Sequence, residues 1–196
     1  MWGGLSLCKK NIKYKMHRID TISYPSKKRT YYYMKRVKKI VHYYRKWLGK
    51  GIVVAVLDTG AIFHPELDGR ILRFYDFVNG RYDLYDDNGH GTHVCGIISG
   101  NRIGIAPEAK LIVLKVLDYE GNGKVEHSMK AFRWILENQE KYNIRVVNIS
   151  MGMKLHMNEQ GAKYILSAVE VLWDMGIVVV AAAGNLGPTE GSITIP

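Results

Sequence analysis

Four runs of apolar residues recur through the second part of this chain, and helical patterns separate them. The runs are residues 52–57, 111–117, 146–150 and 177–183. Between them, the periodicity predicts helices over residues 92–99, 125–142 and 159–175. A short run that is apolar on both faces is typical of a strand in a buried parallel sheet. The alternation predicts a three-layer α/β fold, in which a mostly parallel sheet carries helices on both faces through right-handed crossovers.

The charge of the chain is divided unevenly. Residues 1–50 hold fifteen Lys and Arg and one acid, Asp20, whereas residues 51–196 hold thirteen Lys and Arg and seventeen acids. The net charge of +10 therefore describes a basic arm joined to a mildly acidic domain. We expect a basic extension over residues 1–48 and one domain over residues 49–196, which is long enough to bury a core.

Part of the extension has a helical pattern. Apolar residues recur at three- and four-residue steps over residues 31–48, among lysines and arginines: Met34, Val37, Val41, Tyr44 and Leu48. This predicts a basic amphipathic helix. Such a helix can contact a membrane surface or a nucleic acid. We favour the alternative that its apolar stripe packs on the following domain, and we expect no nucleic-acid partner.

A histidine lies between two glycines in residues 88–96, N-G-H-G-T-H-V-C-G. Gly89 and Gly91 have no Cβ, so another segment or a substrate can approach His90 closely. Asn88 is predicted to cap the helix that follows, which places His90 in or beside the first turn. The positive potential there disfavours an imidazolium ion, so His90 is a candidate general base. The alternative is a glycine-rich turn with an incidental histidine.

Two apolar runs end in polar side chains. The first run leads into Asp58, in I-V-V-A-V-L-D-T-G, and the last leads into Asn185, in I-V-V-V-A-A-A-G-N. The carboxyl ends of parallel strands are where α/β proteins place their chemistry. We therefore expect Asp58 to orient an imidazole and the Asn185 amide to be available as an oxyanion donor.

Together these stretches resemble the subtilisin-like serine proteases. A-V-L-D-T-G followed by His64-Pro65-Glu66-Leu67 matches the aspartate motif of that family, G-H-G-T-H-V matches the histidine motif, and A-A-A-G-N matches the oxyanion asparagine motif. The resemblance covers roughly residues 49–196. It implies a serine endopeptidase that cleaves peptide bonds by acyl transfer, with Asp58, His90 and Asn185 as catalytic residues.

The resemblance also implies where a polypeptide substrate binds. Gly121, Asn122 and Gly123 resemble the edge segment that pairs with an extended substrate as an added strand. Three further residues resemble the wall of the pocket for the residue before the scissile bond: Ser150, Met151 and Gly152. We expect all six to bind substrate.

The serine motif of the family has no counterpart in residues 1–196. Four of the serines outside the extension are candidate substitutes but lie in other settings: Ser128, Ser150, Ser167 and Ser192. We therefore expect a domain truncated at its C-terminus and nearly inactive alone, with a C-terminal segment as a possible partner that supplies the serine. The alternative is an inactive relative that binds extended peptides. An aspartic protease built on Asp58-Thr59-Gly60 would need a second such aspartate, and the sequence has no second D-T-G or D-S-G.

We expect no metal and no cofactor. Asp83, Asp86 and Asp87 cluster, but their spacing does not fit a calcium-binding hand loop, so we predict a solvated loop. His93 has no further ligand at a suitable spacing and is predicted to be structural. The cysteines, Cys8 and Cys95, are far apart, and the start of the chain lacks the apolar stretch of a signal peptide, so we expect a cytoplasmic location.

Overall fold

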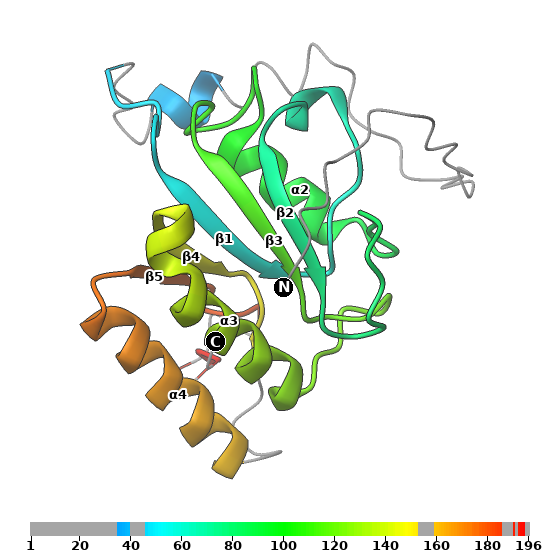
Figure 1. The fold of residues 1–196 in the computed structure, drawn as a ribbon, viewed down its shortest axis with the longest axis vertical. Helices are drawn as coiled ribbons and strands as arrows, with labels where there is room; N and C mark the ends of the chain where they lie inside the picture. Colours follow the sequence, from blue (N-terminus) through cyan, green and yellow to red (C-terminus); the bar gives the residue numbers. More distant parts are fainter. Residues whose placement is uncertain (1–34, 40–45, 153–158, 186–189, 191, 195–196) are drawn as a thin grey trace, which may run out of the picture.

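A five-stranded parallel sheet forms the centre of the computed structural model, which describes residues 35–39, 46–152, 159–185, 190 and 192–194 (Figure 1). Each pair of neighbouring strands is parallel. The strand order across the sheet is β2 (Ile71–Asp76), β3 (Lys110–Lys115), β1 (Val53–Asp58), β4 (Ile144–Ile149) and β5 (Val178–Ala181). The helices are α2 (His90–Ser99), α3 (Val125–Tyr142) and α4 (Glu159–Asp174), with a 3-10 turn η1 at Pro65–Leu67.

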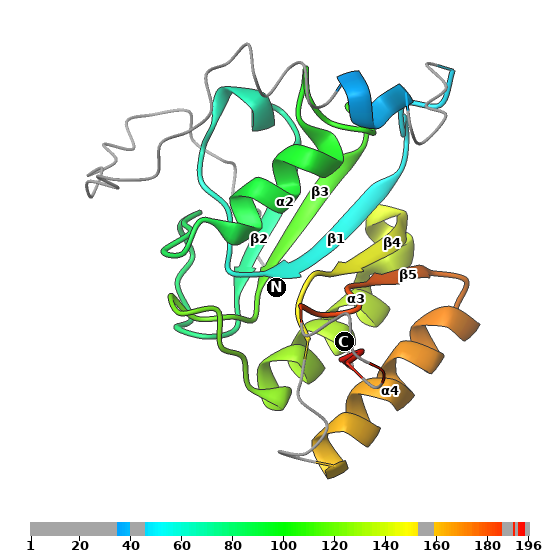
Figure 2. The same cartoon turned by 180° about the vertical axis from the view of Figure 1, so that it is seen from behind.

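Alternate side chains of β1 enter two separate cores, as the two-residue period of a strand requires. Val53, Ala55 and Leu57 pack with residues of α3 and α4, whereas Val54 and Val56 pack on the side of α2. Figures 1 and 2 show α3 and α4 on one face of the sheet and α2 on the other. The predicted α/β fold with helices on both faces is confirmed.

The predicted elements recur with small shifts at their ends. Each apolar run overlaps a strand, and residues Ile71–Asp76 form the further strand β2. Helix α4 ends at Asp174, and Gly176 follows with φ +76°, the left-handed conformation that glycine adopts at helix ends. Helix α2 begins at His90, two residues earlier than its periodicity predicts, because side chains from outside the helix satisfy its first N–H groups.

The predicted helix over residues 31–48 is described only in part. Residues 35–39 are helical, whereas residues 46–48 are not. The predicted stripe residues Met34, Val41 and Tyr44 lie outside the described residues, and Val37 is exposed. Leu48, the last residue of the predicted stripe, is partly buried, and its carbonyl oxygen accepts from the Glu108 N–H at 2.8 Å.

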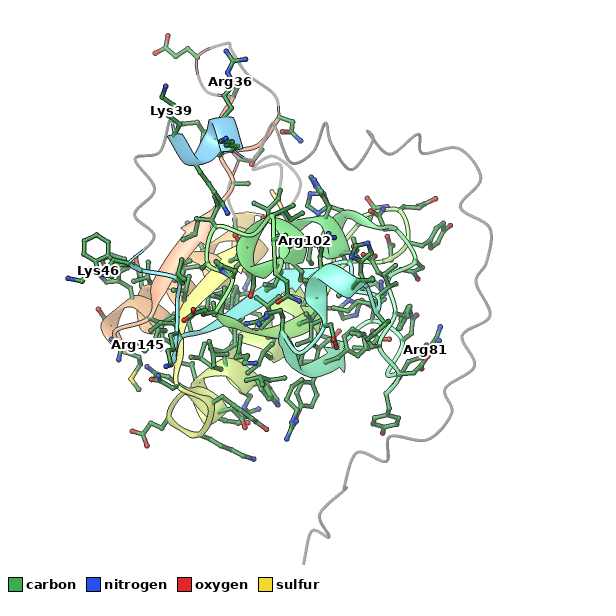
Figure 3. All side chains as sticks on the ribbon, turned by 90° about the horizontal axis from the view of Figure 1, so that it is seen from above. Arg36, Lys39, Lys46, Arg81, Arg102 and Arg145 are labelled. Carbon is green, nitrogen blue, oxygen red and sulfur yellow. The ribbon has the colours of Figure 1, made fainter. Side chains whose placement is uncertain are left out.

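Basic side chains are distributed around the described part of the molecule. Figure 3 labels six of them: Arg36 and Lys39 lie together on residues 35–39, Lys46 and Arg145 lie at another side, Arg81 lies at the opposite side, and Arg102 lies over the middle of the view. In this view they do not gather on one face, although a groove that binds nucleic acid needs clustered positive charge. Within the described ranges, no helix has the length and apolar character needed to cross a bilayer.

Candidate active site

Asp58 is the last residue of β1, and its side chain is completely buried. One carboxylate oxygen accepts a hydrogen bond from the Thr59 backbone N–H at 2.7 Å. Burial raises the pKa of Asp58 above its ordinary value, and the hydrogen bonds from His90 and Thr59 only partly oppose this effect. The site therefore holds a carboxylate whose charge is poorly solvated and depends on its few partners.

His90 lies against this carboxylate. Its Nδ1 is 2.8 Å from Asp58 Oδ1 and 3.0 Å from Oδ2. Because an ionised carboxylate only accepts hydrogen bonds, this contact places the proton of a neutral imidazole on Nδ1 and leaves Nε2 as the acceptor. The side chain is 48% exposed, so Nε2 is within reach of a ligand. The predicted pairing of Asp58 with His90 is therefore present.

The close approach of α2 to the end of β1 requires a glycine. A Cβ built on Gly91 would overlap the carbonyl oxygen of Gly60 and would lie 3.1 Å from Asp58 Oδ1. Gly60 itself has φ +125°, a conformation that side chains disfavour. Gly91 thus allows the backbone after His90 to touch the backbone after Asp58, and Gly60 allows the turn after β1 to approach the Tyr85 carbonyl oxygen.

Side chains from outside the helix satisfy the four free N–H groups at the start of α2. Asp86 accepts from the N–H groups of Gly89 (2.8 Å) and Thr92 (2.9 Å). The His90 N–H donates to Asn88 Oδ1, and the Gly91 N–H donates to Thr59 Oγ1. The predicted position of the cap needs correction, because the cap residue is Gly89, with φ +99° and no side chain to contribute, while Asn88 before it still accepts from the His90 N–H.

The prediction of a solvated loop agrees with the exposure of Asp83 and Asp87 but is wrong for Asp86. Asp83 is exposed and pairs with Arg81. Asp86 is partly buried and accepts five hydrogen bonds. Asp87 accepts from Lys115 Nζ at 2.7 Å. No local sequence pattern indicates these contacts, because the partners Thr59 and Lys115 lie 27 and 28 residues away along the chain.

Lys115 is a buried cation at the end of β3, paired in register with Asp58. Its ammonium group donates to the carbonyl oxygens of Thr59 and Leu117 and to Asp87, each at 2.7 Å. These three acceptors use all three donors of the ammonium group. Lys115 therefore connects the turn after Asp58 to the loop before His90 and to the exit of β3.

A cavity of about 750 Å³ opens beside His90. The residues predicted to bind substrate all line it, and they come from two segments that the fold brings together: Gly121, Asn122, Gly123, Ser150, Met151 and Gly152. Phe132 and Ile165 contribute apolar wall from α3 and α4. This volume is within the range of ligand-binding pockets. The arrangement matches the predicted substrate site, and the binding role of each residue stays a prediction.

The predicted edge segment is a tight turn. The carboxylate of Asp118 accepts from the N–H groups of Glu120 and Asn122, both at 2.9 Å. Gly121 has φ +82°, and Gly123 forms an isolated antiparallel bridge with Leu117. The sequence does not indicate this bridge. It occupies part of the edge, because Gly123 already pairs with Leu117 of the same chain.

Asn185 is exposed and does not line the cavity. It follows β5, which is separated from β1 by β4. No described contact joins it to Asp58 or His90, so its role as an oxyanion donor stays a prediction. Ser150 does line the cavity, but its hydroxyl accepts from Asn148 Nδ2 at 2.7 Å. Among the described residues, no group of three or more His, Cys, Asp and Glu gathers as a metal site.

Comparison with known families decides the class of this domain. The model of the subtilase family matches residues 49–196. The chain belongs to the subtilase family. This subtilase is 39% identical over 170 residues to the serine protease AprX of Bacillus subtilis and 36% identical over 166 residues to Subtilisin Savinase of Lederbergia lenta. These matches cover 81% and 82% of the subtilase.

Solved structures show the same relationship. The subtilase superposes on Sphericase with a TM-score of 0.66 and 32% identity, covering 76% of its own chain and 50% of that protein. A cold-adapted subtilisin-like serine proteinase matches with a TM-score of 0.62 and 32% identity, covering 74% and 50%. The subtilase spans only 38% of AprX and 57% of Savinase. The fold and the serine protease family are thus established for a domain that spans part of its relatives.

Proposed function

We propose that this chain supplies the aspartate and histidine of a site that hydrolyses peptide bonds in an extended polypeptide. The observation that supports the proposal is the contact of His90 Nδ1 with Asp58 at 2.8 and 3.0 Å, beside the cavity that the glycine segment lines. In this site Asp58 holds the imidazole in one tautomer and stabilises its cation. His90 Nε2 takes a proton from a serine hydroxyl and returns it to the leaving amine.

The substrate lies in the cavity along residues 121–123 and 150–152. The backbone of the glycine segment pairs with the extended peptide, and the apolar wall receives a side chain. Asn185 donates to the oxyanion when its segment reaches the reacting carbonyl. Because the pairing uses the peptide backbone, we expect the cavity to bind extended peptides of many sequences. We expect this binding to need no metal and no cofactor.

The serine comes from a further segment in this proposal. Removal of the serine from subtilisin itself lowers kcat by about 2 × 10⁶, which corresponds to roughly 8 to 9 kcal/mol of transition-state stabilisation. A chain of residues 1–196 alone is therefore nearly inactive. Cleavage needs a serine that lies against His90 Nε2.

A fluorophosphonate probe tests the chemistry because it labels only an activated serine. We expect no labelling of the 196-residue chain alone. We expect labelling after it is mixed with the part of AprX that follows the matched region, and loss of this labelling with His90→Ala. Rapid labelling of the chain alone, or labelling of the mixture that survives His90→Ala, would contradict the proposal.

Peptide binding is tested separately by fluorescence anisotropy with a labelled extended peptide. Gly121→Val adds a side chain to the cavity wall and is expected to weaken binding at least tenfold. Gly80→Val is the matched control, since Gly80 also has a positive φ, meets nothing within 4 Å and lies away from the cavity. Binding without any reconstituted labelling would favour the alternative of an inactive peptide-binding relative.

A further inference from the structure

The carboxylate of Asp86 connects the two segments that carry the Asp58–His90 pair. Its Oδ1 accepts from Thr59 Oγ1 at 2.9 Å, from the Asn88 N–H at 3.2 Å and from the Gly89 N–H at 2.8 Å. Its Oδ2 accepts from the backbone N–H and the hydroxyl of Thr92, at 2.9 and 2.6 Å. One side chain thus holds both the turn after β1 and the first turn of α2.

These contacts fix the direct neighbours of both residues in the pair. Thr59 follows Asp58, and its hydroxyl donates to Asp86 while it accepts from the N–H of Gly91. Gly91 in turn follows His90. Hydrogen bonds and chain links together therefore close a ring. It runs from Asp58 through Thr59 and Asp86 to the start of α2, and it returns from His90 to Asp58.

Five donors leave the Asp86 carboxylate no free rotation. An ionised carboxylate offers about four lone-pair directions, so five bonds saturate both oxygens. Burial acts to raise the pKa of Asp86, but hydrogen bonds from Thr92, Gly89 and Thr59 outweigh it and lower the pKa. The group is consequently an ion at neutral pH, with a fixed position and orientation.

Asp86 also contributes charge to the site. Its negative charge adds to the rise in the pKa of Asp58, so the two carboxylates lie close enough to interact. Two further charged groups, Glu120 and Lys124, line the same cavity as His90.

We infer that Asp86 is a positioning residue, which orients His90 on Asp58 by fixing the start of α2 against the turn after β1. It acts through Thr59, Gly89 and Thr92 and does not touch the reacting atoms. The inference rests on the proposed function, because only a histidine that transfers protons needs this precision. A mere capping role would stabilise α2 without setting the geometry of the Nδ1 contact.

The test uses the low-field ¹H NMR signal of the His90 Nδ1 proton in the whole 196-residue chain. A ring N–H held against a carboxylate exchanges slowly and gives such a signal. Asp86→Asn keeps the shape of the side chain but presents an amide to the donors of Thr92. We expect the signal to be lost in this variant at temperatures well below its unfolding transition. Asp83→Asn removes the same charge from the same loop without touching α2, and should keep the signal.

A second pair of variants covers the case in which Asp86→Asn does not fold. Thr92→Val removes one hydroxyl from Asp86 and leaves the carboxylate ionised, and Thr92→Ser retains that hydroxyl. We expect faster exchange of the Nδ1 proton with Thr92→Val and wild-type exchange with Thr92→Ser. An unchanged signal in folded Asp86→Asn, or equal exchange in the two Thr92 variants, would overturn the inference.

Peptide affinity of the unsubstituted chain is measured in parallel. If the chain binds no peptide but the Nδ1 signal still depends on Asp86, the proposed function fails and the structural assignment of Asp86 as the residue that orients His90 stands. If peptide binds and the signal is independent of Asp86, the inference fails alone.

Discussion

The centre of the sheet and its β5 edge are built from similar apolar residues but differ in burial. Every residue of β1 is buried, and five of the six residues of β3 are buried. In β5, Val178 and Val180 are 50% and 48% exposed. The site lies at the end of the buried strands, whereas the β5 edge contributes nothing to the lining of the cavity. The polar groups at the ends of the buried strands, such as Asp58 and Lys115, are therefore shielded from water, and each needs a specific partner.

The largest expected difference between the two regions concerns core packing. Leu57 of β1 is completely buried, and it packs on the face of the sheet that α3 and α4 cover. Leu57→Ala should lower the free energy of unfolding by about 3 kcal/mol, through lost burial and a cavity. Val180→Ala at the edge should cost less than about 1 kcal/mol. Urea denaturation of both variants measures the difference, and equal losses would contradict the comparison.

The next effect concerns the hydrogen bonds of Asp86. Asp86→Ala leaves the N–H groups of Gly89 and Thr92 and two hydroxyl groups without their acceptor. We expect a loss of about 2 kcal/mol, as for removal of a buried acceptor at a helix start. Asp83→Ala, on the same loop, should change stability by less than about 0.5 kcal/mol. Thermal unfolding followed by circular dichroism measures both, and similar melting temperatures would show that the Asp86 contacts are weak.

The same contacts make stability depend on pH. Hydrogen bonds lower the pKa values of Asp86 and Glu66 despite burial. Their contribution is therefore present above the unfolded pKa, about 4, and is lost as pH falls through the lower folded pKa. Unfolding by urea between about pH 5 and 2 should show this loss, and Asp86→Asn should make it shallower. An identical acid limb in the variant would argue against a lowered pKa at Asp86.

Asp58 should behave in the opposite way. Because burial raises its pKa, its contribution to stability is full below the unfolded pKa and is lost as pH rises through the folded pKa. Asp58→Asn should therefore stabilise the chain at neutral pH by roughly 1 kcal/mol, because it removes a buried charge. It should also remove the low-field signal of the His90 Nδ1 proton. A variant less stable than the parent at pH 7 would refute this expectation.

The smallest expected effect on stability is at the edge. Replacing Val178 and Val180 by threonine keeps the β-branched shape and should change the free energy of unfolding by less than about 0.5 kcal/mol. It should nevertheless reduce self-association, since an exposed apolar edge strand is a template for pairing. Sedimentation velocity over a range of concentrations measures this. Unchanged association would mean that another surface is responsible.

Much of the fold could be predicted because its signals are local. The strands are uniform apolar runs, and Gly176 marks a helix end within the sequence itself. The pairing of Asp58 with His90 could be predicted from their motifs and from the position of Asp58 at the carboxyl end of a parallel strand. By contrast, the contacts of Asp86 and Asp87 could not be predicted, because their partners, Thr59 and Lys115, are distant along the chain. The register of β1 with β3 places Lys115 beside Asp58, the residue before Thr59.

Asn185 shows a different limit. Its motif resembles that of an oxyanion donor, but its position depends on how the segment after β5 returns to the sheet. In the described residues, Thr194 pairs with Ala183 through a backbone hydrogen bond of 3.0 Å, and Asn185 remains exposed. A motif thus predicts the kind of residue at a site, whereas its placement requires the surrounding chain.

The crossing of Gly60 and Gly91 has a consequence for anyone who wishes to transplant this dyad onto a designed scaffold. The side chains of Asp58 and His90 meet because Gly91 has no Cβ to overlap the Gly60 carbonyl oxygen and Gly60 has none to overlap the Tyr85 carbonyl oxygen. A graft that copies only the aspartate and the histidine would hold them too far apart on an ordinary helix and strand. The minimal portable unit therefore includes two positions that carry no side chain.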